Sequence, residues 1–289
     1  MIKYKILLIS LILIVISFSS YSQENESKNY NLVSNVTTVG LGSSNILDPY
    51  LSPFEYNGTH LEFLTENRRY ASLSDTILSL NNRLSVILGQ AKHPAGLNTM
   101  MFFNGNYDLG FYRHYRPLTN LNCMLGGSWD VDLGGKYIAR NVNNPFSLDL
   151  YTDVNFAFSA NYTFKLKVFN WFTQNFRVEY GAKTPLAGCM FVPPQGASYY
   201  EIFSLGNFND SFHFTSIHNK RAISQYFNLD IPLKFTTLRV GIKNDLMQYK
   251  ANDIVYHNYN YTVNVGCVVD LYVFNGTKNT TSKNFRRAY

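Results

Sequence analysis

Apolar and polar side chains alternate at every second position along much of this chain. Between Leu148 and Tyr162 the even-numbered residues are mostly apolar, whereas the odd-numbered ones, such as Asp149 and Asn155, are mostly polar. The segment 259–273 repeats the pattern with its apolar residues at odd positions. Because successive side chains of a β-strand point to opposite faces, each run predicts a strand with one apolar and one polar face. Helical spacing explains neither run.

Further segments follow the same rule. Clear alternation occurs near 101–111, 121–133, 172–183, 227–234 and 238–243, and weaker alternation near 33–41, 59–70 and 83–90. Together the segments predict about ten strands. The connections between them alternate between long ones, near 42–58, 134–147 and 185–221, and short ones, near Pro117, 168–170 and 236–237. Long outer loops and short periplasmic turns are typical of outer-membrane barrels, and an even strand number places both termini on the periplasmic side.

We therefore predict an all-β fold, a transmembrane antiparallel up-and-down β-barrel of about ten strands, with twelve as the alternative. A soluble β-sandwich is the competing interpretation, but it predicts neither the alternation in loop length nor strands of about 15 residues. The composition agrees with a barrel, because Tyr and Phe each occur 22 times and charged residues make up only 15%. Such a composition suits an apolar band flanked by aromatic girdles.

The N-terminus predicts export. Two lysines within Met1 to Lys5 precede an apolar and serine-rich run at 6–18, which is typical of a secretory signal peptide. Small residues at Ser20 and Ser22 predict cleavage before Gln23. The run is about 13 residues long, short of the roughly 20 that a spanning helix needs, and no cysteine lies near the cleavage site to carry a lipid anchor.

The expected organisation is a signal peptide at 1–22, a barrel at 23–274 and a flexible basic tail at 275–289. The expected location is the bacterial outer membrane, where the partners would be outer-membrane lipids and, through the last strand, the barrel-assembly machinery. The net charge of +6 does not predict a nucleic-acid partner, because the basic residues are dispersed and the chain is exported.

The cysteines and motifs predict no cofactor and no metal. Cys123 and Cys267 lie in strand patterns and Cys189 in a loop, without the C-x-x-C spacing of metal ligands. We interpret all three as unpaired packing residues. No phosphate-binding loop motif is present.

The polar faces of the predicted strands carry charges of both signs, which would face the lumen. They are Glu62, Glu66, Arg68, Arg83, Asp108, Asp130, Asp132, Asp149, Asp153, Arg177, Glu179, Lys183, Asp230, Lys234, Arg239, Lys243, Asp245 and Asp270. Small barrels are filled by side chains, so mixed charges favour an ion-paired plug over a small-solute channel, which remains an alternative. The neighbours Asp130/Asp132 and Asp149/Asp153 could instead perform acid-base chemistry.

Two loops hold the candidate site residues. In 185–221, Ser216 and His218 would share one face of an extended segment and His213 the other, which is the arrangement of a nucleophile and its base. Glu201 and Asp210 are available to orient the histidine, but no G-x-S-x-G elbow is present. The alternative for these residues is ordinary polar packing in the loop.

The second candidate is the predicted loop at 42–58, where Tyr50, Phe54 and Tyr56 are aromatic. They either pack over the barrel mouth or form a binding surface for a glycan, a lipid headgroup or another envelope protein. The leading functional prediction is a structural or binding role in the envelope. A hydrolase acting on lipid or peptide through Ser216 and His218 is the runner-up, so enzymatic activity is uncertain and less expected than its absence.

Several loop motifs resemble a known family. They are Leu47 to Gly58 (LDPYLSPFEYNG), Glu66 to Arg69 (ENRR), Gly188 to Pro193 (GCMFVP) and His213 to Asn219 (HFTSIHN). Together they resemble an uncharacterised Bacteroidetes-type outer-membrane β-barrel family, domain of unknown function 3316. The resemblance covers nearly all of the mature chain and implies the fold and location, but it transfers no active residue. One departure from many such barrels is that Phe274 is followed by a polar tail, so either Phe274 or Tyr289 would end the assembly signal.

Overall fold

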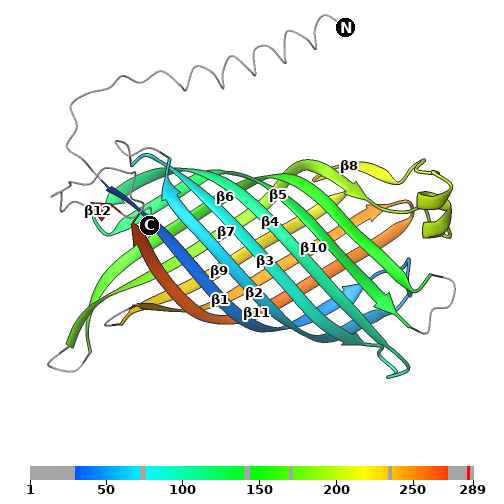
Figure 1. Ribbon diagram of the computed structural model, residues 1–289, viewed down its shortest axis with the longest axis horizontal. Coiled ribbons are helices and arrows are strands. Elements are labelled where there is room, and N and C mark those ends of the chain that lie inside the picture. Colours follow the sequence, from blue (N-terminus) through cyan, green and yellow to red (C-terminus); the bar gives the residue numbers. More distant parts are fainter. Residues whose placement is uncertain are drawn as a thin grey trace, which may run out of the picture.

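Ten strands close into an antiparallel barrel in the computed structural model, which describes residues 30–71, 76–139, 144–168, 172–233, 236–272 and 285–286 (Figure 1). The wall strands are β1 (Tyr30–Leu47), β2 (Glu55–Tyr70), β3 (Leu78–Lys92), β4 (Thr99–Leu118), β5 (Leu121–Ile138), β6 (Phe146–Val168), β7 (Phe172–Phe191), β9 (Lys220–Pro232), β10 (Thr237–Ala251) and β11 (Ile254–Tyr272). Antiparallel pairing of β1 with β11 closes the wall. The prediction of an all-β barrel of about ten strands is confirmed.

The two faces of the wall follow the alternation in the sequence. On β11 the side chains of Val263 and Val265 are 61% and 52% exposed, whereas those of Thr262 and Asn264 are 2% and 7% exposed. The other wall strands alternate in the same sense over most of their length, with apolar residues outward and polar residues in the lumen, whereas toward the loop end inward residues such as Ile46 and Met100 are apolar. The predicted faces are therefore confirmed, because the period of two in a strand assigns each residue to one side.

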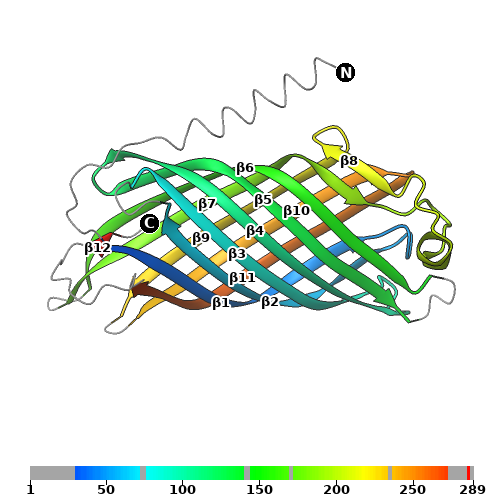
Figure 2. The ribbon, with the colours of Figure 1, turned by 45° about the horizontal axis from the view of Figure 1, so that its top comes forward.

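The wall strands are long and steeply tilted (Figures 1 and 2). They contain between 13 and 23 residues. A tilted strand needs only about 9–11 residues to cross a bilayer, so the barrel is longer than the thickness of a membrane. In the described part of the chain, no helix is both long and apolar enough to cross a membrane.

The connections divide the barrel into two ends, which we call the turn end and the loop end. The turn end carries the connections 71–77, 119–120, 169–171 and 233–236 together with the start of β1 and the end of β11. The loop end carries 48–54, 93–98, 139–145, 192–219 and 252–253. Both ends of the barrel segment thus lie on one side, as an even strand number requires.

The predicted loops were too long, because the strands continue past the clear alternation. Residues 42–47 belong to β1 and 55–58 to β2, and β5 and β6 extend to Ile138 and from Phe146. The prediction of a loop over 134–147 was therefore also wrong at both ends. Backbone pairing needs no alternation of side chains, so a strand can continue where its pattern fades.

The connection after β7 contains structure that the sequence did not reveal. Residues 185–191 belong to β7, so Cys189 lies in a strand and the prediction of a loop there was wrong. A short helix, η1 (Tyr200–Ser204), and the strand β8 (Phe212–Ser216) follow. β9 pairs with β7 only along Arg177–Lys183, and β8 pairs with β7 along Ala187–Phe191. β8 thereby extends the wall toward the loop end.

Some predictions lie outside the described residues. They concern the signal peptide at 1–22 with its cleavage site, Lys234, Phe274 and most of the tail at 275–289. From that tail, Phe285–Arg286 form the two-residue strand β12, which pairs parallel with Tyr30 and Asn31 at the turn end (Figure 1).

Candidate functional site

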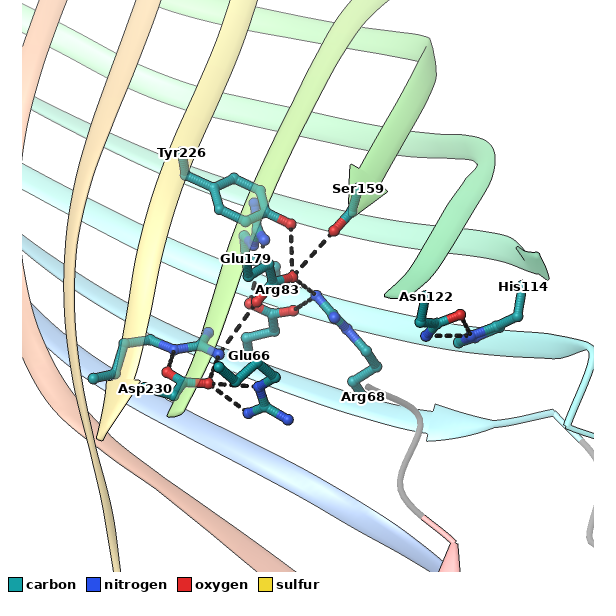
Figure 3. A network of polar contacts seen from close by, with 11 residues as sticks. Glu66, Arg68, Arg83, His114, Asn122, Ser159, Glu179, Tyr226 and Asp230 are labelled. Carbon is teal, nitrogen blue, oxygen red and sulfur yellow. Dashed lines mark hydrogen bonds and ion pairs between the residues drawn. The ribbon is translucent and has the colours of Figure 1, made fainter. Parts of the chain in front are cut away.

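The lumen toward the turn end is occupied by an arginine–carboxylate network (Figure 3). Its members come from β2, β3, β7, β9 and β10 and are Glu66, Arg68, Arg83, Arg177, Glu179, Asp230 and Arg239. Arg239 donates two hydrogen bonds to Asp230, of 2.7 Å from Nε to Oδ1 and 2.9 Å from Nη2 to Oδ2. Arg177 donates to the same carboxylate. Two-point contacts of this kind fix orientation as well as charge.

Glu179 is the centre of this network, and its side chain is fully buried. It accepts hydrogen bonds from Arg68 at 3.0 Å, from Arg239 at 3.2 Å, and from the hydroxyls of Ser159 and Tyr226, each at 3.2 Å (Figure 3). Four donors from four strands therefore converge on one carboxylate. Such an arrangement stabilises a charge that burial alone would disfavour.

Between the arginine–carboxylate network and the loop end, three lysines pair with carboxylates in the lumen. Lys183 lies 2.6 Å from both Asp108 and Asp130. Lys243 lies 2.6 Å from Glu62 and 2.7 Å from Asp245, and Lys220 contacts Asp153. A cavity of about 120 Å³ lies among these residues. Its polar lining and size suit a group of water molecules.

The carboxylates of each candidate acid-base pair have different partners, and an acid-base role for them stays a prediction. Asp130 pairs with Lys183, whereas Asp132 accepts hydrogen bonds from Asn104 and Asn106. Asp149 and Asp153 pair with different lysines. Within the described ranges, no three His, Cys, Asp or Glu residues are grouped so that they could hold a metal ion.

The loop end of the lumen is filled by an apolar and aromatic cluster, which we call the aromatic plug. It consists of Ile46, Tyr50, Leu51, Tyr56, Ile87, Ala91, Met100, Phe102, Ile138, Tyr151, Met190, Val192, Tyr249, Ile254 and Tyr256. The rings of Tyr249 and Tyr256 stack with centroids 4.5 Å apart. Both rings are buried at the loop end of the lumen.

One buried cation, Lys136, lies within the aromatic plug. Its side chain is 1% exposed, and its Nζ lies 3.0 Å from Asp48 and 2.5 Å from Asp149. The same nitrogen lies 4.6 Å from the centre of the Tyr256 ring, which adds a cation–π contact. Because Asp48 begins the loop 48–54, this ion pair holds the loop onto the wall.

The three aromatic candidates of that loop have different environments. Tyr50 is 9% exposed and donates a hydrogen bond to the carbonyl oxygen of Ala197 at 2.8 Å. Burial, with Asp48 and Glu201 nearby, raises the pKa of Tyr50 to about 12.

Tyr56 is fully buried and donates to Asn98 at 2.8 Å, whereas Phe54 is 52% exposed and packs against His93. Tyr50 and Tyr56 therefore belong to the plug. Of the three residues, Phe54 is the one that presents its ring to the surroundings, and its role in binding stays a prediction.

Ser216 and His218 do meet, but at an exposed turn between β8 and β9. The distance from Ser216 Oγ to His218 Nδ1 is 2.5 Å. Neither Glu201 nor Asp210 contacts His218 among the described residues: Glu201 Oε2 accepts the backbone N–H of Ser198, and the contact of Asp210 is made by its backbone carbonyl, which accepts from Asn252. A catalytic role for the pair stays a prediction.

His213 is separate from that pair. It lies on β8 opposite Met190, and its Nε2 is buried without a hydrogen-bond partner among the described residues. The structure therefore does not bring the three candidates His213, Ser216 and His218 into one cluster.

Sequence reasoning missed Lys136, Lys220, Asp48 and three tyrosines of the plug, Tyr151, Tyr249 and Tyr256. Lys136 had a usable signal, since it continues the row of even-numbered lumen residues from Asn122 through Asp132. Lys220 and Asp48 had none, because both lie beside a loop where the alternation is absent.

The chain is similar to solved structures of membrane barrels. It shares 7% identity with the outer membrane protease OmpT from Escherichia coli, over 87% of this chain and 100% of that chain, with a TM-score of 0.43. The transport unit of the autotransporter AIDA-I from Escherichia coli has 8% identity over 88% and 93% of the two chains, and a TM-score of 0.42. The translocator domain of the autotransporter NalP from Neisseria meningitidis has 9% identity over 94% of this chain and 96% of that chain, and a TM-score of 0.37.

The sequence comparisons give one family. No curated protein matches the chain. Residues 5–278 match the family described as "Protein of unknown function (DUF3316)", and the chain belongs to that family.

Proposed function

We propose that this protein is a bacterial outer-membrane β-barrel with a closed lumen, which has a structural or binding role in the cell envelope. The observation that carries the proposal is the filling of the lumen at both ends. Toward the turn end, the side chains of Glu179 and Arg239 are at most 2% exposed, and at the loop end Tyr56 and Tyr256 are fully buried. An ion that crossed the barrel would have to displace side chains of both the arginine–carboxylate network and the aromatic plug.

The outward face supports the membrane setting. Large apolar side chains on it are about half exposed around the wall, including Leu125, Phe156, Ile242 and Val265. Hydrocarbon is the solvent in which such a band is stable. The short connections would then face the periplasm and the loops the exterior, where Phe54 and the loop 192–219 are available to an envelope glycan or protein. Assembly would proceed through β11, the strand that closes the wall against β1.

The closed lumen is tested by electrical recording. Purified protein in planar bilayers should show no sustained open conductance. Steady ohmic current from single inserted barrels would reject the closed lumen and favour a small-solute channel.

The membrane setting is tested by changing a residue of the outward face. Val265→Arg should cost roughly 2–4 kcal/mol of folding free energy in bilayers, because hydrocarbon cannot solvate the guanidinium. The measurement is the heat-modifiable gel shift after folding into lipid vesicles, with Val265→Leu as the control. Folding of Val265→Arg as complete as that of the wild type would favour a soluble β-sheet.

A second candidate, a hydrolase, has one observation in its favour, the short contact between Ser216 and His218. Incubation with outer-membrane lipids and a broad peptide panel should leave all substrates unchanged. Turnover that disappears in Ser216→Ala or His218→Ala would make the hydrolase the leading function.

A further inference from the structure

The outward face of β9–β11 changes from polar to apolar over one step along the strands. Near the loop end, the outward pair Lys250 and Val255 is followed by a polar row in which Arg221, Gln248 and His257 are opposite one another in register. The next outward row along the strands consists of Ile223, Leu246 and Tyr259. A boundary of this kind marks the level at which a barrel wall passes from the headgroup region into hydrocarbon.

A groove lies across this boundary. It has a volume of about 410 Å³ and is lined by Arg221, Ala222, Ile223, Leu246, Met247, Gln248, Tyr259 and Tyr261. A second outward groove, of about 300 Å³ between Trp129, Leu150, Cys189 and Phe212, has no charged residue in its lining. The groove on β9–β11 therefore combines an apolar floor with a cation at its loop-end rim.

Arg221 lines the groove at that rim, and a second cation, Lys250, lies one outward row nearer the loop end. Arg221 and Lys250 are exposed, and neither makes an ion pair within the described residues. Lys250 lies two residues beyond Gln248 on the same outward face of β10. Cations of the lumen such as Lys183, Lys220 and Arg239 differ from these two, because they are paired with carboxylates. The two rim cations remain available for an external anion.

We propose that this groove binds a phosphorylated lipid of the outer leaflet, with the phosphate at Arg221 and Lys250 and an acyl chain along Ile223 and Leu246. Arginine matches a phosphate with two parallel hydrogen bonds. Tyrosines such as Tyr259 are favoured at the headgroup level. Free phosphate would use the cations but not the apolar floor, which continues directly into the apolar wall. The proposal rests on the proposed membrane setting.

The test is native mass spectrometry of the folded, full mature chain with equal amounts of phosphatidylglycerol and phosphatidylcholine. A cation at a membrane surface contributes about 1 kcal/mol to binding an anionic lipid, so the wild type should prefer phosphatidylglycerol about fivefold or more. Arg221→Gln should abolish most of this preference, and Arg221→Lys should retain part of it. Arg113→Gln is the matched control, because Arg113 is an exposed arginine on the outward face of β4 near the turn end.

Several outcomes would overturn the site. They are equal binding of both lipids by the wild type, an Arg113→Gln effect as large as that of Arg221→Gln, and Arg221-dependent binding of inorganic phosphate alone with the same affinity. Displacement of lipid by a second copy of the chain would also overturn it. Failure of the membrane setting looks different, because the wild type would then lack a heat-modifiable band and Val265→Arg would be tolerated.

Discussion

The two ends of the lumen are both filled, but with different chemistry. Toward the turn end, four arginines share three carboxylates, and each carboxylate has at least two cationic neighbours. In the aromatic plug at the loop end, Asp48 and Asp149 both pair with Lys136 and with no other cation among the described residues. Tyrosine rings and aliphatic side chains surround this ion pair.

Because of this difference, we expect the loss of one cation to destabilise the network and the plug to different degrees. A shared network can lose one member, since the remaining arginines still face each carboxylate. A buried carboxylate whose only cation is removed keeps its full desolvation penalty. Moreover, the network lies on strands, whereas the plug includes Tyr50 of a loop, and the ion pair of Lys136 includes Asp48 of the same loop. We therefore expect the loop end to be the more sensitive of the two.

The largest effect is expected for Lys136→Met. It leaves Asp48 and Asp149 buried without a cation, and breaking a buried pair in this way costs about 3–5 kcal/mol. Urea unfolding in lipid vesicles measures the loss, and limited proteolysis within 48–54 should become faster. The control is Lys92→Met, which removes an exposed lysine near the same end. If the two variants unfold at the same urea concentration, the plug does not depend on the ion pair of Lys136.

A smaller effect is expected for Arg239→Met, at about 2 kcal/mol, since Arg177 still pairs with Asp230 and Arg68 with Glu179. The same urea titration applies, and cleavage within 48–54 should stay at the wild-type rate. A loss larger than that of Lys136→Met would reverse the comparison between the two ends.

The smallest effect is expected for Tyr50→Phe, which removes the hydrogen bond to Ala197 and costs about 1 kcal/mol. This position also predicts a pH dependence. Because the pKa of Tyr50 is raised to about 12, its neutral phenol stabilises the loop fully below the unfolded pKa of about 10. That contribution is lost as the pH rises from 10 toward 12.

Proteolysis within 48–54 should therefore accelerate over this alkaline range in the wild type. In Tyr50→Phe the acceleration should be weaker, because the titrating phenol is absent. An identical pH profile for the two proteins would show that Tyr50 does not control the loop.

Much of the fold could be predicted from the alternation of polar and apolar residues along each strand. The exposed Val265 and the buried Asn264 are on the sides that their alternation indicated, because a strand gives each residue only two directions. The structure near the loop end was harder to predict from the sequence. The extension of β1 to Leu47 and the strand β8 depend on pairing with distant segments, and a local pattern contains no information about such a partner.

The sequence by itself determined the all-β barrel, the two faces of the wall and most of the charged residues that enter the lumen, but it left ten and twelve strands as alternatives and missed Lys136 and Lys220. Only the tertiary structure decided which of those charges meet. Lys243 and Glu62 are 181 residues apart in the chain and pair across the lumen, and Arg68 reaches Glu179 over 111 residues. The physical reason is that alternation is a property of one strand, whereas these contacts depend on the register and closure of the whole barrel.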